Sequence, residues 1–217
     1  MTNISETNGL VSPPKPAPRM DESRANVETK EFSSKPYRQG AFDGFCGVYS
    51  VINAMKLIAK NGDGFGEEFC ELLFNALIRH ATLKIGARRL IRSGTPHRLM
   101  RSFLRGSCDY VSRNRKLKPC VKRPLLREGR LSIDSVIDIM RRELAAQRCA
   151  FIVEIGGVHS HWTVIRSISR AQVQLFDSDG LNVLNISELR MSYETPDPRA
   201  KHWLVAGSIF MITRCKP

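Results

Sequence analysis

A single cysteine stands where a glycine-containing turn gives way to an apolar helix, and this junction constrains the chain more than any other. After Cys46-Gly47, apolar side chains recur at steps of three and four as far as Ala59, which is the period of an α-helix. Asn61-Gly62 then supplies a stop signal. In the first turn of a helix, unpaired N–H groups and the positive end of the dipole favour a thiolate over a thiol. The sequence therefore predicts that Cys46 is a nucleophile.

A thiolate nucleophile needs a base and a group that orients this base, and the second half of the chain offers both. Two β-rich runs, 156–165 and 171–177, flank a turn near residue 169 in a hairpin pattern. Antiparallel pairing about such a turn joins positions whose numbers sum to about 338, which places His161 opposite Asp177. A register slip of two residues keeps the two side chains on one face, whereas a slip of one separates them.

Three short motifs in this order resemble those of papain-like cysteine peptidases, in particular the bacterial branch that trims leader peptides. They are Gln-Gly leading into Cys46-Gly47, then His-Trp-Thr-Val-Ile from His161, then Leu-Phe-Asp-Ser around Asp177. The resemblance covers residues 37–60 and 149–180. It implies Cys46 as nucleophile, His161 as general base and acid, and Asp177 as the residue that fixes the imidazole tautomer. It further implies Gln39 as an oxyanion-hole donor.

The resemblance also implies a fold and an activity. The fold would be α+β and papain-like, with an N-terminal helical part whose nucleophile helix packs on a C-terminal antiparallel β-sheet. The activity would be hydrolysis of a protein or peptide substrate without a cofactor. We expect Trp162, Gly157 and Asp43 to contact the substrate.

Periodicity predicts the remaining elements of an α+β domain. We expect helices over 66–79, 96–104 and 132–147, an exposed loop over 113–118, strands over 149–155, 182–186 and 203–213, and a helical turn over 187–190.

Other assignments of the same residues stay open. An acyl transferase of the transglutaminase-like kind would use the same three side chains and differ only in its acceptor. His159 and His161 are two residues apart, a spacing that on a strand puts both rings on one face, where they could bind a metal. We nevertheless expect no metal at this site. Asp179 competes with Asp177 for the orienting role, and we favour Asp177 because apolar residues lead directly into it.

Positive charge is concentrated in residues 79–130, a segment that we call the basic block. It holds sixteen Lys or Arg and two acids, whereas the rest of the chain holds 18 basic and 19 acidic residues. Such a surface attracts an acidic protein or a polyanion, so a non-catalytic binding module is a further alternative. Only Phe103 and Tyr110 are interleaved aromatics, which makes nucleic acid the less favoured partner.

The composition of the chain and of its N-terminal segment limits the number of domains and the cellular location that we expect. Residues 1–35 are polar, carry a proline-rich stretch and predict a disordered arm, which leaves 36–217 as one catalytic domain. No apolar run is long enough to span a membrane, and the first residues lack the basic, then apolar, then small-residue order of a signal peptide, so we expect neither feature. The six cysteines lack C-x-x-C spacing, so we expect no disulfide framework and a reducing, cytoplasmic location. Delivery as a secreted effector or toxin stays open.

Overall fold

The computed structural model of the chain describes residues 35–40, 44–125 and 128–215. Apart from Lys35, the expected N-terminal arm lies outside the described residues, as does Asp43. The elements of the described part, in chain order, are α1 (Cys46–Ile58), α2 (Glu67–Ile85), α3 (Ala87–Ser93), α4 (His97–Asn114), β1 (Pro119–Lys122), α5 (Ile133–Ala146), β2 (Cys149–Gly157), β3 (His161–Ile168), β4 (Gln172–Leu175), β5 (Val183–Asn185), a 3₁₀ turn (Ile186–Glu188), β6 (Leu189–Met191) and β7 (His202–Arg214).

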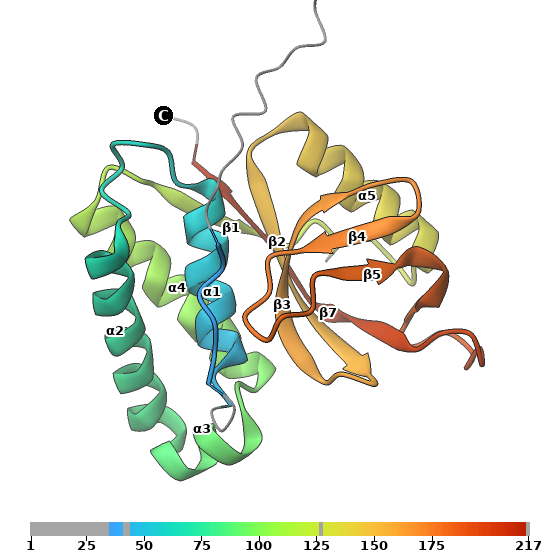
Figure 1. The fold of residues 1–217 in the computed structure, drawn as a ribbon, viewed down its shortest axis with the longest axis horizontal. Coiled ribbons are helices and arrows are strands. Elements are labelled where there is room, and N and C mark those ends of the chain that lie inside the picture. Colours follow the sequence, from blue (N-terminus) through green and yellow to red (C-terminus); the bar gives the residue numbers. More distant parts are fainter. Residues whose placement is uncertain (1–34, 41–43, 126–127, 216–217) are drawn as a thin grey trace, which may run out of the picture. The chain divides into compact units, whose positions relative to one another are not determined.

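The strands form one sheet in the order β1-β7-β2-β3-β4-β5, and β6 adds to β7. All pairings are antiparallel except that of β6 with β7, which is parallel. The chain is therefore α+β, with N-terminal helices packed on a mostly antiparallel C-terminal sheet, as the sequence predicts (Figure 1). Among the described helices, none combines the length and the apolarity that crossing a membrane requires.

The sheet separates two apolar cores. Helices α1, α2 and α4 gather on one side of it, and α5 lies on the other (Figure 1). Along β2, Ile152 belongs to the core beneath α1, whereas Phe151 belongs to the core beneath α5. This alternation is the period of two that a strand buried on both faces requires.

The periodicity located most helices but not all their ends. α1 and α5 occupy the expected segments, and the Ser132 hydroxyl caps α5 by accepting from the N–H of Ser135 at 3.3 Å. α2 and α4 run further than expected, to Ile85 and Asn114. Periodicity did not predict α3, a short helix between two positive-φ glycines, Gly86 and Gly94.

The predicted register of the β3–β4 hairpin is wrong by two to three residues. Ile165 pairs with Leu175 and Ile168 with Val173, so paired numbers sum to 340 or 341. The cause is twofold: the turn is closed by a Ser169 N–H to Gln172 carbonyl bond of 2.8 Å, and a bulge lies between Ile165 and Ser167.

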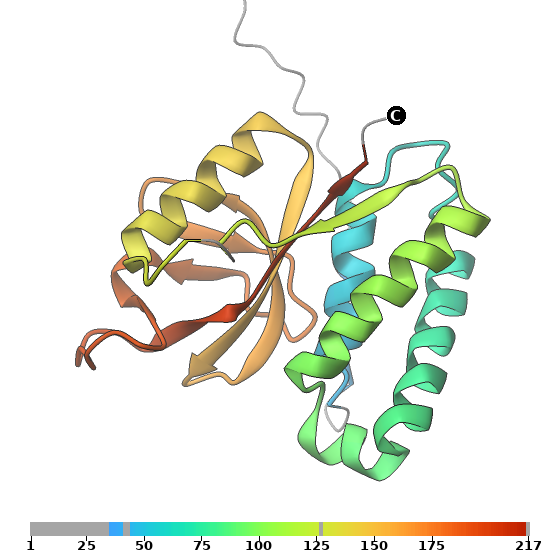
Figure 2. The ribbon, with the colours of Figure 1, turned by 180° about the vertical axis from the view of Figure 1, so that it is seen from behind.

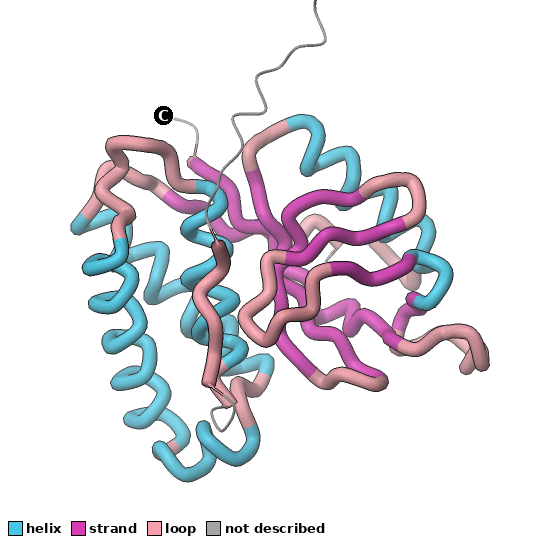
Figure 3. Tube along the Cα trace, viewed as in Figure 1, coloured by secondary structure: helices cyan, strands magenta, loops and turns pink. Residues whose placement is uncertain are grey.

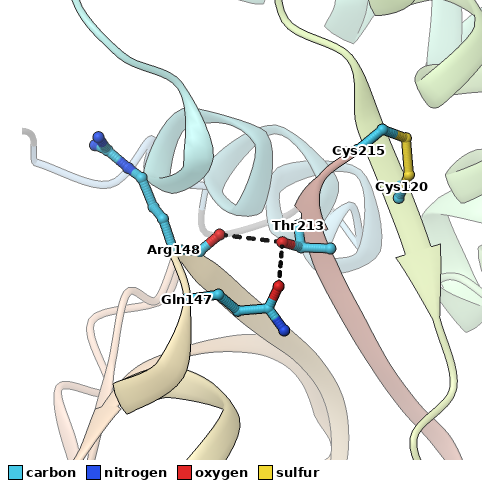
Figure 4. Close-up of a disulfide and its surroundings, with 5 residues drawn as sticks. All are labelled: Cys120, Gln147, Arg148, Thr213 and Cys215. Carbon is cyan, nitrogen blue, oxygen red and sulfur yellow. Dashed lines mark hydrogen bonds between the residues drawn. A yellow bond between two sulfur atoms is a disulfide. The ribbon is translucent and has the colours of Figure 1, made fainter. Parts of the chain in front are cut away.

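A disulfide joins Cys120 on β1 to Cys215 just after β7, with Cα atoms 5.3 Å apart (Figure 4). No disulfide framework was expected from the sequence, and this single disulfide was not predicted, because a spacing of 95 residues gives no hint that the antiparallel β1–β7 pairing brings the two cysteines together. Beside it, the Thr213 hydroxyl bonds the side-chain oxygen of Gln147 at 3.2 Å and the backbone carbonyl of Arg148 at 3.3 Å (Figure 4).

Candidate active site

Cys46 is the first residue of α1 and is half-buried. The N-cap residue is Phe45, which has no side-chain acceptor, and the first turn contains no acidic residue. The N–H groups of this turn therefore keep their capacity to stabilise negative charge on the sulfur or on a bound oxyanion.

Contacts one turn along the helix hold Cys46 against β3. The Ser50 hydroxyl donates to the backbone carbonyl of Trp162 at 2.9 Å. Residues four apart share one face of a helix, so the Ser50 bond brings Cys46 to the start of β3, where His161 lies. The indole N–H of Trp162 in turn donates to the Thr95 carbonyl at 2.7 Å, which anchors the α3–α4 connection beside the same strand.

His161 and Asp177 form a buried pair. Nε2 of His161 lies 2.7 Å from Oδ2 of Asp177, and their side chains are 8% and 0% exposed. The other carboxylate oxygen accepts from the backbone N–H groups of Asp179 at 2.7 Å and Leu181 at 3.2 Å. Burial is the largest single influence and would raise the pKa of Asp177, but the hydrogen bond and charge of His161, together with Thr163 and the bond from the Asp179 backbone, outweigh it and lower the pKa. The carboxylate is thus fixed in place and charged.

Cys46 and His161 line the same cavity, and the Cys46 side chain helps to raise the pKa of His161. Since Nε2 of the ring is bound to Asp177, Nδ1 is the nitrogen that remains for the sulfur. Burial opposes the charged imidazole, yet the interactions with Asp177 and Cys46 outweigh it and raise the pKa of His161 to about 10. A charged imidazole beside the sulfur is the environment that makes a cysteine reactive.

The other free cysteines have the opposite environment. They are Cys70, Cys108 and Cys149. Burial raises the pKa of Cys70, and it raises the pKa of both Cys108 and Cys149 to about 12. A raised pKa disfavours the thiolate form of these three thiols near neutral pH.

Residues 35–40 run as an extended segment beside α1 (Figure 3). The side-chain amide of the buried Asn53 pairs with the backbone of Tyr37, accepting at 2.8 Å and donating at 3.2 Å. Two residues on, the Gln39 N–H donates to the Ser178 carbonyl at 3.0 Å. The segment thus bridges α1 and the residue that follows Asp177, and it brings Gln39 to the cavity of Cys46.

A cavity of about 470 Å³ opens beside Cys46. Of the predicted residues, Cys46, His161, Gln39, Trp162 and the rival Asp179 line it. Asp177 lies behind His161 and outside the lining. Gly157 does not line the cavity either: it has φ +107°, and a Cβ there would lie 2.1 Å from the Lys201 carbonyl oxygen, so the backbone requires a glycine.

One wall of this cavity, residues 91–95, was not predicted from the sequence. This wall touches the start of the nucleophile helix: a Cβ on Gly44 would lie 2.8 Å from the Ile91 carbonyl, and one on Gly47 would lie 2.5 Å from Thr95. The Gly94-Thr95-Pro96 turn signal was the available hint, but it does not reveal which helix the turn meets.

The positions of His159 and His161 do not support the alternative that these two residues form a metal site. His159 lies in the β2–β3 connection and stacks on His202 with centroids 5.6 Å apart, whereas His161 binds Asp177. Within the described residues, no group of three or more His, Cys, Asp or Glu side chains is arranged to hold a metal ion.

Comparisons with protein-family models, with curated proteins and with solved structures gave no match. The candidate site is therefore defined by its own geometry, namely the contacts among Cys46, His161 and Asp177 and the cavity beside them.

Proposed function

We propose that the chain is a cysteine-dependent hydrolase of the papain-like class that cleaves protein or peptide substrates. The observation that carries this proposal is that Cys46 and His161 line one open cavity, that Cys46 helps to raise the pKa of His161, and that His161 is hydrogen-bonded to Asp177 behind it. Each member has the neighbour that its role requires: a sulfur at a helix start, an imidazole beside it, and a buried carboxylate behind the imidazole.

In the first half-reaction, the Cys46 thiolate attacks the carbonyl carbon of the scissile amide, a C–S bond forms and the carbonyl electron pair moves to oxygen. His161, protonated on Nδ1, then gives its proton to the leaving nitrogen as the C–N bond breaks. The products of this step are a free amine and a thioester on Cys46.

In the second half-reaction, the neutral Nδ1 of His161 takes a proton from water while the water oxygen attacks the thioester carbonyl. Collapse of the tetrahedral intermediate breaks the C–S bond, releases the carboxylic acid product and restores the thiolate and imidazolium pair. Asp177 holds the ring throughout by accepting from Nε2, which keeps Nδ1 directed at the sulfur.

Two donors are proposed for the tetrahedral oxyanion. One is the backbone N–H of Cys46 at the N-terminus of α1, and the other is the side-chain amide of Gln39, which lines the same cavity. Donors fixed in advance stabilise the charge where it develops, and removing one of them typically costs about a hundredfold or more in kcat. The Gln39 backbone is already held by Ser178, so its side chain reaches the cavity from a fixed anchor.

A covalent probe tests this proposal. A peptidyl acyloxymethyl ketone should label the native protein on Cys46, as mapped by mass spectrometry, and Cys46→Ala should abolish the labelling with an unchanged circular dichroism spectrum. Cys149→Ala, which removes a buried free thiol instead, is the matched control and should label normally. Equal labelling of Cys46→Ala, or no labelling of the native protein, would overturn the proposal.

A further inference from the structure

A second cavity, of about 310 Å³, lies between α4 and the β1–β7 edge of the sheet. Figure 2 shows α4 leading into β1, which pairs with β7. Its lining includes Arg101, Arg105 and Arg123 and the apolar residues Leu104, Val121 and Phe210, which we call its floor. We call this cavity the arginine pocket.

One of the three guanidinium groups is held in place by the protein. Nη2 of Arg123 donates to the Gly207 carbonyl at 2.9 Å, and its guanidinium carbon lies 5.6 Å from the ring centroid of Phe210. These contacts fix its plane but leave it without an acidic partner in the described part of the chain. A fixed guanidinium without a counter-ion is prepared to bind an anion.

The other two guanidinium groups, those of Arg101 and Arg105, have no protein partner among the described residues. Arg101 and Arg105 lie one turn apart on α4 and are exposed, and neither makes a hydrogen bond or an ion pair with another described residue. The one acidic residue in the lining is Asp109. The pocket therefore has an excess of two positive charges, within a basic block that favours anionic partners over a longer range.

The floor of the arginine pocket distinguishes between anionic partners. Phe210 is only 1% exposed, and His97 stacks against it at 5.7 Å, so its ring cannot serve as a stacking platform for a nucleobase. An apolar floor beneath guanidinium groups suits a carboxylate that neighbours an aliphatic or aromatic side chain. Arginine binds carboxylates through two parallel hydrogen bonds, which adds geometric selectivity to the charge.

We propose that the arginine pocket binds an acidic polypeptide segment, with its carboxylates on Arg101, Arg105 and Arg123 and an apolar side chain against Val121, the half-buried residue of the floor. The pocket lies close to the candidate active site, because Phe210 on its floor is 6.2 Å from the ring of Trp162, which lines the other cavity. Binding does not require Cys46 to react, so this inference goes beyond the proposed function and is independent of it.

A binding experiment with the full chain carrying Cys46→Ala separates the inference from catalysis. The probe is a short dye-labelled peptide of alternating glutamate and leucine, followed by fluorescence anisotropy, and the matched peptide replaces glutamate by glutamine. The pocket variant is Arg101→Glu/Arg105→Glu. Both side chains are exposed, and thermal melting verifies that the variant folds. The control, Arg88→Glu/Arg89→Glu, reverses the same charge on the exposed surface of α3.

We expect the Glu-Leu peptide to bind, the Gln-Leu peptide to bind at least about tenfold more weakly, and the pocket variant to lose about tenfold or more in affinity. The α3 control variant should lose much less affinity for the Glu-Leu peptide. Arg101→Lys should also weaken binding, because lysine keeps the charge but not the paired hydrogen bonds. Equal loss in the two variants, equal binding of the two peptides, or tighter binding of a single-stranded oligonucleotide than of the Glu-Leu peptide would overturn the inference.

Discussion

Nε2 of His161, at the start of β3, lies 2.7 Å from Oδ2 of Asp177, two residues beyond the end of β4. The Ile165–Leu175 pairing, extended past the end of β4, would set Asp177 beside Thr163 and not opposite His161, so the contact is diagonal. Diagonal neighbours on one face of an antiparallel pair are within reach of long side chains, and both residues project to the same face. Strand parity, and not direct pairing, accounts for the meeting of this histidine and this carboxylate.

Asp177→Asn tests the role of that contact. The substitution removes the negative charge that helps to raise the pKa of His161 to about 10, so the imidazolium is lost at lower pH and the alkaline limb of the kcat/KM profile moves to lower pH. We expect kcat/KM to fall by roughly a hundredfold to ten-thousandfold, as misorientation of a triad histidine does elsewhere. Steady-state rates over a pH series measure both effects.

Asp179→Asn is the matched control. Its backbone N–H, and not its side chain, bonds Asp177, so the variant keeps the His161 contact. Its pH profile should superimpose on that of the native protein. A shift of the alkaline limb in Asp179→Asn that equals the shift in Asp177→Asn would contradict the assignment.

Gly47→Ala tests the close packing behind the nucleophile. The added methyl group would lie 2.5 Å from the Cβ and Oγ1 atoms of Thr95, which form part of the cavity wall. We expect a loss of about 1–3 kcal/mol in the free energy of unfolding in urea, together with reduced turnover. Gly106→Ala on α4 meets no atom within 4 Å and should stabilise the protein by up to about 1 kcal/mol, since alanine favours a helix. Equal effects of the two substitutions would refute this view of the site.

Cys120→Ser tests the disulfide. The bond closes a loop with a sequence separation of 95 residues, so its loss should lower the free energy of unfolding by about 2–4 kcal/mol through the greater entropy of the unfolded chain. Urea denaturation without reductant measures the change. Adding dithiothreitol should lower the urea concentration at the unfolding midpoint of the native protein toward that of the variant. The midpoint of the variant itself should not change. A native midpoint that does not respond to reductant would show that the bond is not formed.

The helices that carry chemistry could be predicted from sequence because their signals are local. The apolar period after Cys46 gave α1, and Ser132 marked the start of α5. The contact between His161 and Asp177 was predictable only as a shared face, because a bulge changes register without changing the sequence pattern. The pairs nearest the turn sum to 341, an odd difference from the predicted 338 that would separate the two side chains, and the bulge brings the sum to 340, which returns them to one face.

The features that could not be predicted from the sequence depend on contacts between residues that are far apart along the chain. Cys120 and Cys215 meet through the pairing of β1 with β7, which no cysteine spacing reveals. Thr95 reaches the site because two glycines at the start of α1, Gly44 and Gly47, allow residues 90–95 to approach closely. A glycine in a sequence shows that space is needed, but it does not identify the neighbour that uses it.

The identity of the acyl acceptor distinguishes a hydrolase from a transferase with the same three side chains. We expect water to be the acceptor, so a dansylated alkylamine added during turnover should not appear in the product. Incubation in ¹⁸O-labelled water should place the label in the new carboxylate. Amine incorporation in preference to ¹⁸O would reassign the protein as an acyl transferase, while leaving the roles of Cys46 and His161 intact.

The most direct test of the central claim is the rate at which iodoacetamide alkylates each free cysteine of the native protein near neutral pH, resolved by peptide mapping. We predict that Cys46 reacts at least about tenfold faster than free cysteine and that His161→Gln abolishes this advantage, because the imidazolium stabilises the thiolate. Cys108 and Cys149, whose pKa values burial raises to about 12, should react far more slowly. A Cys46 rate no greater than that of free cysteine, or one unchanged by His161→Gln, would contradict the claim that these two side chains form a catalytic pair.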